Sequence, residues 1–274
     1  MREKNIEIFN DTIKLQKENE FLKENIKDSI KNQKIYLEKD DLKSNKGNKS
    51  AQIIISKKRT FEAASNYKNK KVCILNFASA TNPGGGVTKG STAQEECLCR
   101  CSTLYPCLNT KENWDSFYNK HRKLNNPIYN DDCIYTPDVT VYKTDTFEPK
   151  LMNQKDWYRV NVISCAAPNL RLKPSNAMNP NAGDKPAKLT DKELYELHLK
   201  RGRKIFEIAK ANGNEVLILG AFGCGAFKNP PQIVAKCYKQ LIEEYKDSFD
   251  VIEFAIYCSP RDTINYETFK QILK

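Results

Sequence analysis

Residues 72–77 have the sequence VCILNF, and they are followed by ASATNPGGGVTKG (78–90) and then by STAQEE (91–96). A short apolar run rich in Val, Ile, Leu and Phe predicts a buried strand. Consecutive glycines, as in the loop that follows, allow the backbone to approach a ligand closely and to present N–H groups to it. Because ligands of α/β sheets bind beyond the carboxyl ends of the strands, this loop is the first candidate for a functional site.

The residues after the glycine loop predict the start of a helix. Ser91 with Gln94, or Thr92 with Glu95, has the spacing of a capping box, which is typical of a helix N-terminus. Glu95 and Glu96 then lie in the first turn of this helix. The sequence therefore predicts two carboxylates next to the glycine loop.

The order of residues in the glycine loop excludes two common phosphate-binding motifs. A P-loop requires Gly-Lys followed by Ser or Thr, whereas Lys89 precedes Gly90 in this chain. A dinucleotide-binding fingerprint requires G-x-G-x-x-G, which Gly84, Gly86 and Lys89 do not supply. We expect a different kind of loop for binding phosphate or ribose.

From residue 51 onward, short apolar runs alternate with helical patterns. The predicted strands are 52–55, 72–77, 139–143, 160–165, 215–220 and 251–257. The predicted helices are 91–105, 190–212, 230–246 and 263–273, and the polar stretch 169–189 is expected to be an exposed loop beside the site. Near-continuous apolar strands between helices imply a sheet that is covered on both faces, so we predict a three-layer α/β/α fold.

A second glycine-rich loop, AFGCGAFKNP (221–230), also connects a predicted strand to a predicted helix. Such a connection can bind phosphate through backbone N–H groups and the helix dipole. Phe227 is either a ligand contact or a core residue in this setting. Cys224 is expected to be a small packed residue rather than a nucleophile, because neither of the two histidines stands near a recognisable partner motif.

Residues 1–50 have a different character, with many Lys, Glu and Asn residues and with apolar residues three or four positions apart. This spacing predicts amphipathic helices. The apolar register breaks between Ile13 and Leu22, which argues against a coiled coil. We expect a helical N-terminal extension, 1–50, packed on a main domain, 51–274, with a polar linker at 43–49.

The overall charge favours anionic ligands. The chain carries 45 Lys and Arg against 34 Asp and Glu, a formal net charge of +11, although a lysine-rich surface also serves solubility. The first residues lack the apolar core of a signal peptide, and no stretch is apolar enough to span a membrane, so we expect a cytoplasmic protein without membrane contact. The ten cysteines are then expected to be buried free thiols.

Together these motifs resemble those of one enzyme family. NFASATNP, then GGG, seven residues and QEE is similar to the signature of bacterial-type poly(ADP-ribose) glycohydrolases. The second loop, GAFGCGAFKNPP (220–231), is similar to the GAxGCGxFxNxP segment of that family. The resemblance covers residues from about 50 to 260 and implies a macrodomain-like α/β fold with a mixed sheet.

The resemblance implies a hydrolase that cleaves the ribose–ribose O-glycosidic bond of poly(ADP-ribose) and releases ADP-ribose. By resemblance, Glu96 protonates the leaving hydroxyl and then activates the attacking water, while Glu95 and Asn82 hold the riboses. The second loop wraps the diphosphate, with Phe227 against a ribose. The substrate-binding residues expected on this basis are Asn82, Gly84, Gly85, Gly86, Gln94, Gly223, Cys224, Gly225, Ala226 and Phe227.

Three other functions are alternatives to the hydrolysis of poly(ADP-ribose). The same pocket could serve a hydrolase that removes single ADP-ribose units from protein or nucleic acid, or a non-catalytic module that only binds ADP-ribose. The pair of glutamates discriminates against a pure binding module, which needs no acid at that position. A nucleic-acid-binding protein would fit the charge, but the chain has no motif for reading a groove or stacking bases.

The sequence favours neither a metal nor a cofactor. Cys97, Cys99, Cys101 and Cys107 lie close together, but no C-x-x-C pair occurs among them, and alternate residues of a helix point in different directions. Thiols on a buried helix face are the better interpretation. We also expect the protein to be a monomer.

Overall fold

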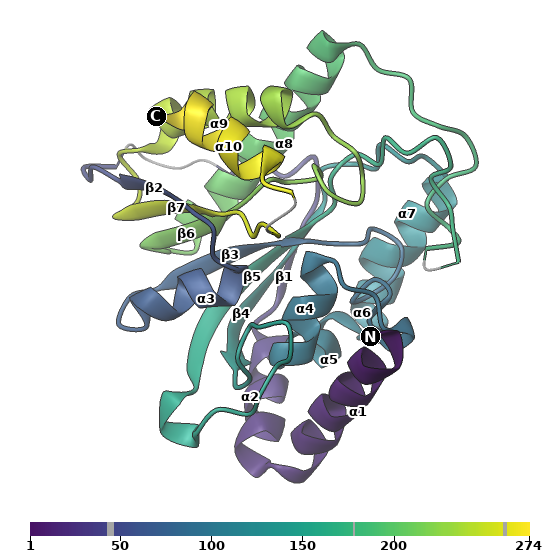
Figure 1. Ribbon diagram of the computed structural model, residues 1–274, viewed down its shortest axis with the longest axis vertical. Helices are drawn as coiled ribbons and strands as arrows, with labels where there is room; N and C mark the ends of the chain where they lie inside the picture. The colour runs from purple at the N-terminus through teal and green to yellow at the C-terminus, as the bar shows by residue number, and fades with distance from the viewer. Residues whose placement is uncertain (43–46, 178, 260–261) are drawn as a thin grey trace.

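The computed structural model describes residues 1–42, 47–177, 179–259 and 262–274. Its strands form a seven-stranded sheet in the order β1-β4-β5-β3-β6-β7-β2 (Figure 1). The strands are β1 (Lys34–Tyr36), β2 (Gln52–Ser56), β3 (Val72–Phe77), β4 (Cys133–Val141), β5 (Tyr158–Cys165), β6 (Val216–Leu219) and β7 (Val251–Ala255). Five neighbouring strands, from β5 to β2, are parallel, whereas β4 is antiparallel to both β1 and β5.

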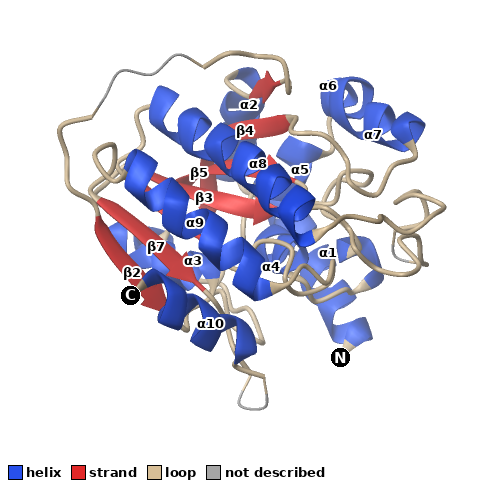
Figure 2. Cartoon of the chain, turned by 90° about the horizontal axis from the view of Figure 1, so that it is seen from above, coloured by secondary structure: helices blue, strands red, loops and turns tan. Residues whose placement is uncertain are grey.

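Helices cover both faces of this sheet. The helices are α1 (Arg2–Glu18), α2 (Glu20–Lys31), α3 (Thr60–Ala64), α4 (Gln94–Cys101), α5 (Leu104–Leu108), α6 (Lys111–Asn113), α7 (Asn119–Leu124), α8 (Asp191–Ala211), α9 (Pro231–Tyr245) and α10 (Ile264–Leu273). Shorter turns are η1 (Ser65–Tyr67), η2 (Val87–Lys89), the π-helical η3 (Trp114–Tyr118) and η4 (Gln154–Asp156). Helices α8, α9 and α10 lie over one face, and α1 to α5 lie on the other (Figures 1 and 2). The predicted three-layer α/β/α fold with a mixed sheet is confirmed.

Alternation along β3 divides the interior into two cores. Cys73 and Leu75 pack in the cluster that includes α8, α9 and α10, while Val72 and Ile74 pack in the cluster with α3, α4 and α5. Successive side chains of a strand point to opposite faces, so a strand that is apolar throughout must be covered on both sides. Because β3 lies in the middle of the sheet, the starting position of the loop that follows it is fixed.

The predicted strands agree with the structure except at β4. The run 72–77 is matched residue for residue, and 52–55, 160–165, 215–220 and 251–257 agree within two residues at each end. The predicted strand 139–143 is wrong in its bounds, because β4 already begins at Cys133. Pro137 and a register shift between Thr136 and Val139 interrupt the local pattern, while pairing with β5 continues across them.

The predicted helices 190–212, 230–246 and 263–273 correspond to α8, α9 and α10. The helix predicted at 91–105 is wrong, because it divides into α4 and α5 at Ser102, whose backbone is extended and bridges to Val141. Neither predicted capping box forms. Helix α4 begins after Ala93 without a side-chain cap, since the side chains of its first residues are used elsewhere.

The first two helices pack against the same layer as α4. Helix α1 contacts it through polar groups: Nδ2 of Asn5 donates to the carbonyl of Gly90 and Oγ1 of Thr12 donates to the carbonyl of Arg100. The short strand β1, which pairs with β4, has no predicted counterpart in the sequence. The division into an extension, 1–50, and a main domain stays a prediction, and residues 43–46 of the predicted linker lie outside the described residues.

All ten cysteines are free thiols, and seven of them are buried. Cys97, Cys224 and Cys258 are half-buried. In the described ranges, none of the helices has the length and apolar character needed to cross a membrane. The predicted monomeric state and cytoplasmic location stay predictions.

Candidate active site

A cavity of about 790 Å³ opens at the carboxyl ends of the parallel strands. Residues from both predicted loops line it, and so do residues that follow β2, β5 and β7. Figure 1 shows how this edge of the sheet faces the start of α4. Glu95 and Glu96 are both in the cavity wall.

The carboxylate of Glu95 is held by groups of β3 and the loop after it. Only 2% of the residue is exposed. Nδ2 of Asn76 donates to Oε1 over 3.2 Å, and the backbone N–H of Ser79 donates to Oε2 over 2.7 Å. Both carboxylate oxygens therefore accept hydrogen bonds within the protein.

Glu96 is held on one side only. The backbone N–H of Gly86 donates to its Oε1 over 2.8 Å. Its Oε2 is buried and has no hydrogen-bond partner among the described residues. One oxygen is thus fixed by the glycine loop, and the other is left for a proton or for a ligand.

Both carboxyl groups have raised pKa values. Burial first, and the neighbouring Glu96 second, raise the pKa of Glu95 from 4.5 to about 8. Burial also raises the pKa of Glu96, whereas the N–H of Gly86 and the charge of Arg100 oppose this rise. Two adjacent buried carboxyl groups titrate as a pair. Oε2 of Glu96 is the one carboxylate oxygen of the pair that accepts no hydrogen bond from the described residues, whereas both oxygens of Glu95 accept N–H donors.

Gln94 is fully engaged with the protein. Its Oε1 accepts from the N–H of Phe77 over 2.8 Å, and its Nε2 donates to the carbonyl of Leu75 and to Oγ1 of Thr60. These bonds join the first residue of α4 to the end of β3. They fix the position of the glutamate pair relative to the sheet.

The triple glycine lies directly against the two carboxylates. A Cβ atom at Gly85, where φ is +56°, would lie 2.6 Å from Oε1 of Glu96 and 3.1 Å from Oε2 of Glu95. A Cβ at Gly84 would lie 2.8 Å from the ring of Tyr105. Only glycine gives both the backbone conformation and the close approach at these positions.

The second loop is stabilised from behind by Asn229. Nδ2 of this residue donates to the carbonyls of Pro168 and Gly223, and its Oδ1 contacts Nε2 of His198 at 2.8 Å. Burial lowers the pKa of His198 to about 4, so the ring is neutral and the tautomer that donates to Asn229 satisfies this contact. Gly225, by contrast, has open space where a Cβ would lie.

Phe227 is half-buried and contributes to the cavity wall. It packs against Tyr129, with ring centroids 6.3 Å apart, and against Ala80 and Ala166. It is therefore both a packing residue and a wall residue, and the two interpretations of the sequence are compatible.

Asn82 lies behind the cavity wall rather than in it. Its Oδ1 accepts from Nη2 of Arg122 over 2.6 Å, and its Nδ2 donates to Oδ1 of Asn179 over 3.0 Å. Asn179 does line the cavity. Neither Gly84 nor Cys224 is among the lining residues.

A second part of the cavity extends past Cys97 toward the ends of β2 and β7. The guanidinium carbon of Arg59 lies 3.9 Å from the ring centroid of Tyr257, and Tyr257 is 53% exposed. Oδ2 of Asp145 accepts from the N–H of Phe61, whereas Oδ1 is buried without a partner among the described residues. Burial raises the pKa of Asp145.

The structure brings most of the predicted residues to one cavity. The lining includes Gly85, Gly86, Gln94, Glu95, Glu96, Gly223, Gly225, Ala226 and Phe227. The sequence pattern does not single out Ser79, Arg122, Asp145 or Asn179. Ser79 lies within the recognised motif NFASATNP (76–83) and Asn179 within the polar stretch 169–189, whereas Arg122 and Asp145 lie in segments with no local signal. Their roles, like those of the predicted residues, are proposals.

The described part of the chain contains no group of three or more His, Cys, Asp or Glu residues that could hold an ion. The prediction of buried free thiols is confirmed for Cys99, Cys101 and Cys107. Cys97 differs, because it lines the cavity and its Sγ accepts from Nη2 of Arg100 over 3.2 Å.

Comparison with known proteins connects this site to one family. The family model described as microbial-type PARG, catalytic domain, matches residues 3–144, which include α1 and α2 as well as the glycine loop and the glutamate pair. No curated protein matches the sequence.

Solved structures show the same fold over nearly the whole chain. Poly(ADP-ribose) glycohydrolase (PARG) from Thermomonospora curvata has a TM-score of 0.85 and 25% identity, covering 99% of this chain and 100% of that one. The enzyme from that bacterium bound to the inhibitor ADP-HPD has a TM-score of 0.81 and 25% identity, with 98% and 99% covered. PARG from Deinococcus radiodurans in complex with ADP-ribose has a TM-score of 0.76 and 27% identity, with 90% and 96% covered.

The family match extends over half of the chain, and the structural similarity extends over the rest. The chain therefore belongs to the microbial-type poly(ADP-ribose) glycohydrolase (PARG) family and is an enzyme of that family.

Proposed function

We propose that the protein hydrolyses the ribose–ribose O-glycosidic bond of poly(ADP-ribose) and releases ADP-ribose, with Glu96 as the general acid and then the general base. The observation that carries this proposal is the asymmetry of Glu96. Its Oε1 accepts from Gly86, while Oε2 is buried, unpartnered among the described residues and part of a cavity-lining side chain.

Cleavage at an anomeric carbon passes through an oxocarbenium-like transition state and requires a proton on the leaving oxygen. Glu96 in its protonated form donates that proton to the 2′-oxygen of the neighbouring ribose as the bond from this oxygen to the anomeric carbon breaks. The carboxylate that remains accepts a proton from the water that attacks the anomeric carbon. This water contributes the new hydroxyl, and Glu96 ends in its starting form.

Glu95 has a different role in this proposal. Both of its oxygens accept hydrogen bonds from β3 and the loop after it. It thereby holds the loop in place, and its proximity makes a second negative charge on Glu96 unfavourable. We assign Glu95 to the positioning of the loop and the ribose, and not to proton transfer.

The residues that line the cavity support a nucleotide-containing substrate. Gly223 and Gly225 provide backbone in the wall formed by the second loop, where a diphosphate can be bound. The exposed ring of Tyr257 beneath Arg59 offers a surface for stacking a base. We assign the glutamate end of the cavity to the reacting ribose and the Tyr257 end to the adenine.

The test is incubation of the purified protein with poly(ADP-ribose) and, separately, with a mono-ADP-ribosylated protein, followed by chromatography of the released products. We expect free ADP-ribose from the polymer with wild-type protein and almost none with Glu96→Gln. Release only from the mono-modified protein would identify a mono-ADP-ribosyl hydrolase. Binding of ADP-ribose without release from either substrate would identify a binding module.

A further inference from the structure

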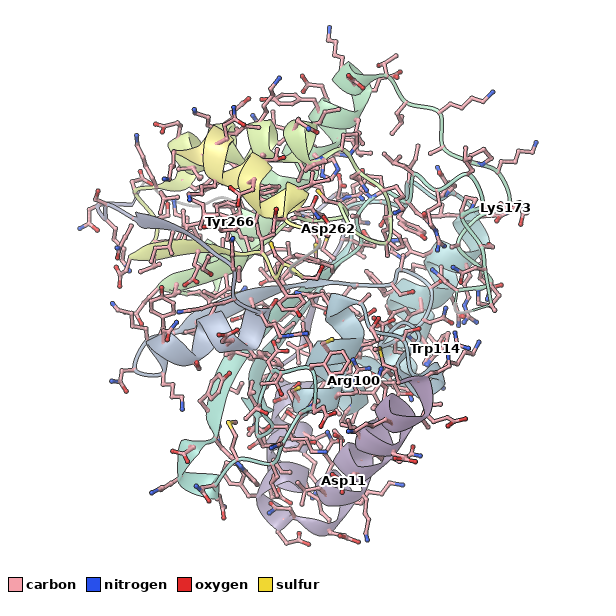
Figure 3. The ribbon with its side chains drawn as sticks, viewed as in Figure 1. Asp11, Arg100, Trp114, Lys173, Asp262 and Tyr266 are labelled. Atoms are coloured by element: carbon pink, nitrogen blue, oxygen red, sulfur yellow. The ribbon has the colours of Figure 1, made fainter. Side chains whose placement is uncertain are left out.

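The first loop is held from outside the cavity by Arg122. Nε of Arg122 donates to the carbonyl of Thr81 over 2.8 Å, and Nη2 donates to Oδ1 of Asn82 over 2.6 Å. The guanidinium carbon lies 4.6 Å from the ring centroid of Trp114, which is labelled in Figure 3. A guanidinium group can donate hydrogen bonds but cannot accept them. Arg122 therefore determines which end of the Asn82 amide is the oxygen.

The orientation of the Asn82 amide in turn determines the orientation of the Asn179 amide. Because the oxygen of Asn82 faces Arg122, its Nδ2 points the other way and donates to Oδ1 of Asn179 over 3.0 Å. Oγ1 of Thr81 donates to the same oxygen over 2.5 Å. Two donors thus converge on Oδ1 of Asn179, and its Nδ2 must point away from the loop.

Nδ2 of Asn179 is therefore the donor that these two amides leave at the cavity. Asn179 is only 9% exposed and lines the cavity. Nδ2 carries two hydrogens, and one of them can point toward the neighbouring hydroxyl of Tyr129. Because Asn179 is in the cavity wall, the other hydrogen can be donated to a ligand in the cavity.

A second uncharged group lies beside Asn179. The hydroxyl of Tyr129 is buried and has no hydrogen-bond partner among the described residues. Burial raises the pKa of Tyr129, and the neighbouring amides of Asn169 and Asn179 oppose the rise. The backbone of Tyr129 has a φ of +59°, which is uncommon for a non-glycine residue. Tyr129 is not in the cavity wall, so it adjoins Asn179 from behind, and the uncharged amide in the wall is suited to a sugar hydroxyl.

We propose that Asn179 contacts the substrate by donating a hydrogen bond from Nδ2 to a ribose hydroxyl, and that Arg122 is a positioning residue that sets the orientation of Asn179 through Asn82. This inference rests on the proposed function, because it assumes an ADP-ribose unit in the cavity. It also gives Asn82 an indirect role, since the structure places Asn82 behind the wall and Asn179 in it.

The contact is tested with Asn179→Asp and Asn179→Ala. Aspartate keeps the oxygen that accepts from Thr81 and Asn82 but replaces the donor nitrogen by an acceptor, and alanine removes both. We expect each variant to lower kcat/KM on poly(ADP-ribose) and the affinity for ADP-ribose by about 10- to 100-fold, the effect of an unsatisfied polar contact. Wild-type values of both quantities in Asn179→Asp would overturn the proposed contact.

The positioning role is tested with Arg122→Lys and Arg122→Met. Lysine also only donates, so it can still face the Asn82 oxygen, and we expect it to retain most of the activity and affinity. Methionine removes the donor and allows the amides to turn, so we expect a loss of several-fold. Arg203→Met is the matched control, because it removes an arginine that pairs with Glu244 on the far helices.

The double variant Arg122→Met, Asn179→Asp distinguishes an effect through Asn179 from general damage. If Arg122 acts through Asn179, the double variant should be no worse than Asn179→Asp alone. Losses that multiply, or equal losses in Arg122→Lys and Arg122→Met, would overturn the positioning role. Thermal unfolding of each variant identifies any that fail to fold.

Measuring the affinity for ADP-ribose distinguishes a failure of this inference from a failure of the proposed function. A wild-type protein that binds ADP-ribose but releases none from the polymer refutes the proposed function, while the ratio of wild-type to Asn179→Asp affinity still decides the role of Asn179. If the polymer is hydrolysed and all variants match the wild type, the proposed function stands and the inference fails.

Discussion

The backbone N–H of Gly86 donates a 2.8 Å hydrogen bond to Oε1 of Glu96, so the glycine loop itself fixes the carboxyl group that adjoins it. The bond uses one oxygen and leaves the other buried without a described partner. A carboxyl group held in this way has a defined direction in which to present a proton. The glycine loop therefore positions the carboxyl group of Glu96 as well as forming a wall of the cavity.

Glu96→Gln should lower the hydrolysis rate by about 10²- to 10⁴-fold, because an amide preserves the shape but cannot supply a proton. The affinity for ADP-ribose should stay close to that of the wild type. The measurement pairs turnover of poly(ADP-ribose) with calorimetry of ADP-ribose binding. Glu112→Gln, a change at an exposed glutamate of α6, is the control. Near-normal turnover by purified Glu96→Gln protein would refute the mechanism.

Glu95→Gln should make stability less dependent on pH. The pKa of Glu95 is raised from 4.5 to about 8. Between these values the folded protein keeps a proton that the unfolded chain has released, so the free energy of unfolding falls as pH rises, by at most about 1.4 kcal/mol per pH unit. Urea denaturation at several pH values should show a flatter profile for the variant. An unchanged slope would mean that Glu95 does not contribute to the proton that the carboxyl pair binds.

Gly85→Val should impair both binding and hydrolysis. Any Cβ at this position meets the two carboxylates, and the φ of +56° is unfavourable for a β-branched residue. The loop must shift, and Glu96 with it, so we expect turnover to fall more than affinity. Gly213→Val is the matched control, since its φ is also positive, its Cβ would approach only Nζ of Lys71 at 3.7 Å, and it is not in the cavity wall. If the two variants had equal activity, close approach at Gly85 would not matter.

Arg100→Met should move the alkaline limb of the pH–rate profile to higher pH. The charge of Arg100, which is labelled in Figure 3, lowers the pKa of Glu96 against the effect of burial. Only protonated Glu96 can donate, so activity is lost as pH rises through its pKa, and a higher pKa extends the active range. Arg100→Lys keeps the charge and should leave the limb near its wild-type position. A limb that does not move in Arg100→Met would exclude this electrostatic coupling.

Turnover of poly(ADP-ribose) should decrease more steeply with salt than the binding of free ADP-ribose does. The chain has a formal net charge of +11, and a polymer offers many phosphates to it at once. Both quantities can be measured over a series of NaCl concentrations at one pH. Equal slopes would show that the positive charge serves solubility alone.

Local patterns in the sequence were sufficient for the parts of the molecule that depend on neighbouring residues. The apolar run of β3, the periodic helices α8, α9 and α10, and the two glycine loops were recognised because burial and backbone conformation leave a short-range pattern. The same patterns failed at β4, where Pro137 interrupts the run although pairing with β5 continues. They also failed at α4, where tertiary contacts replace the expected cap.

The sequence by itself determined that a strand, a glycine loop and two glutamates adjoin one another, because these features are consecutive in the chain. Only the tertiary structure decided what each side chain does there. Gln94 is hydrogen-bonded to β3, and Asn82 is hydrogen-bonded to Asn179, which lines the cavity and is 97 positions away. Hydrogen bonds between distant segments depend on how the chain packs, and packing leaves no periodic signal near either partner.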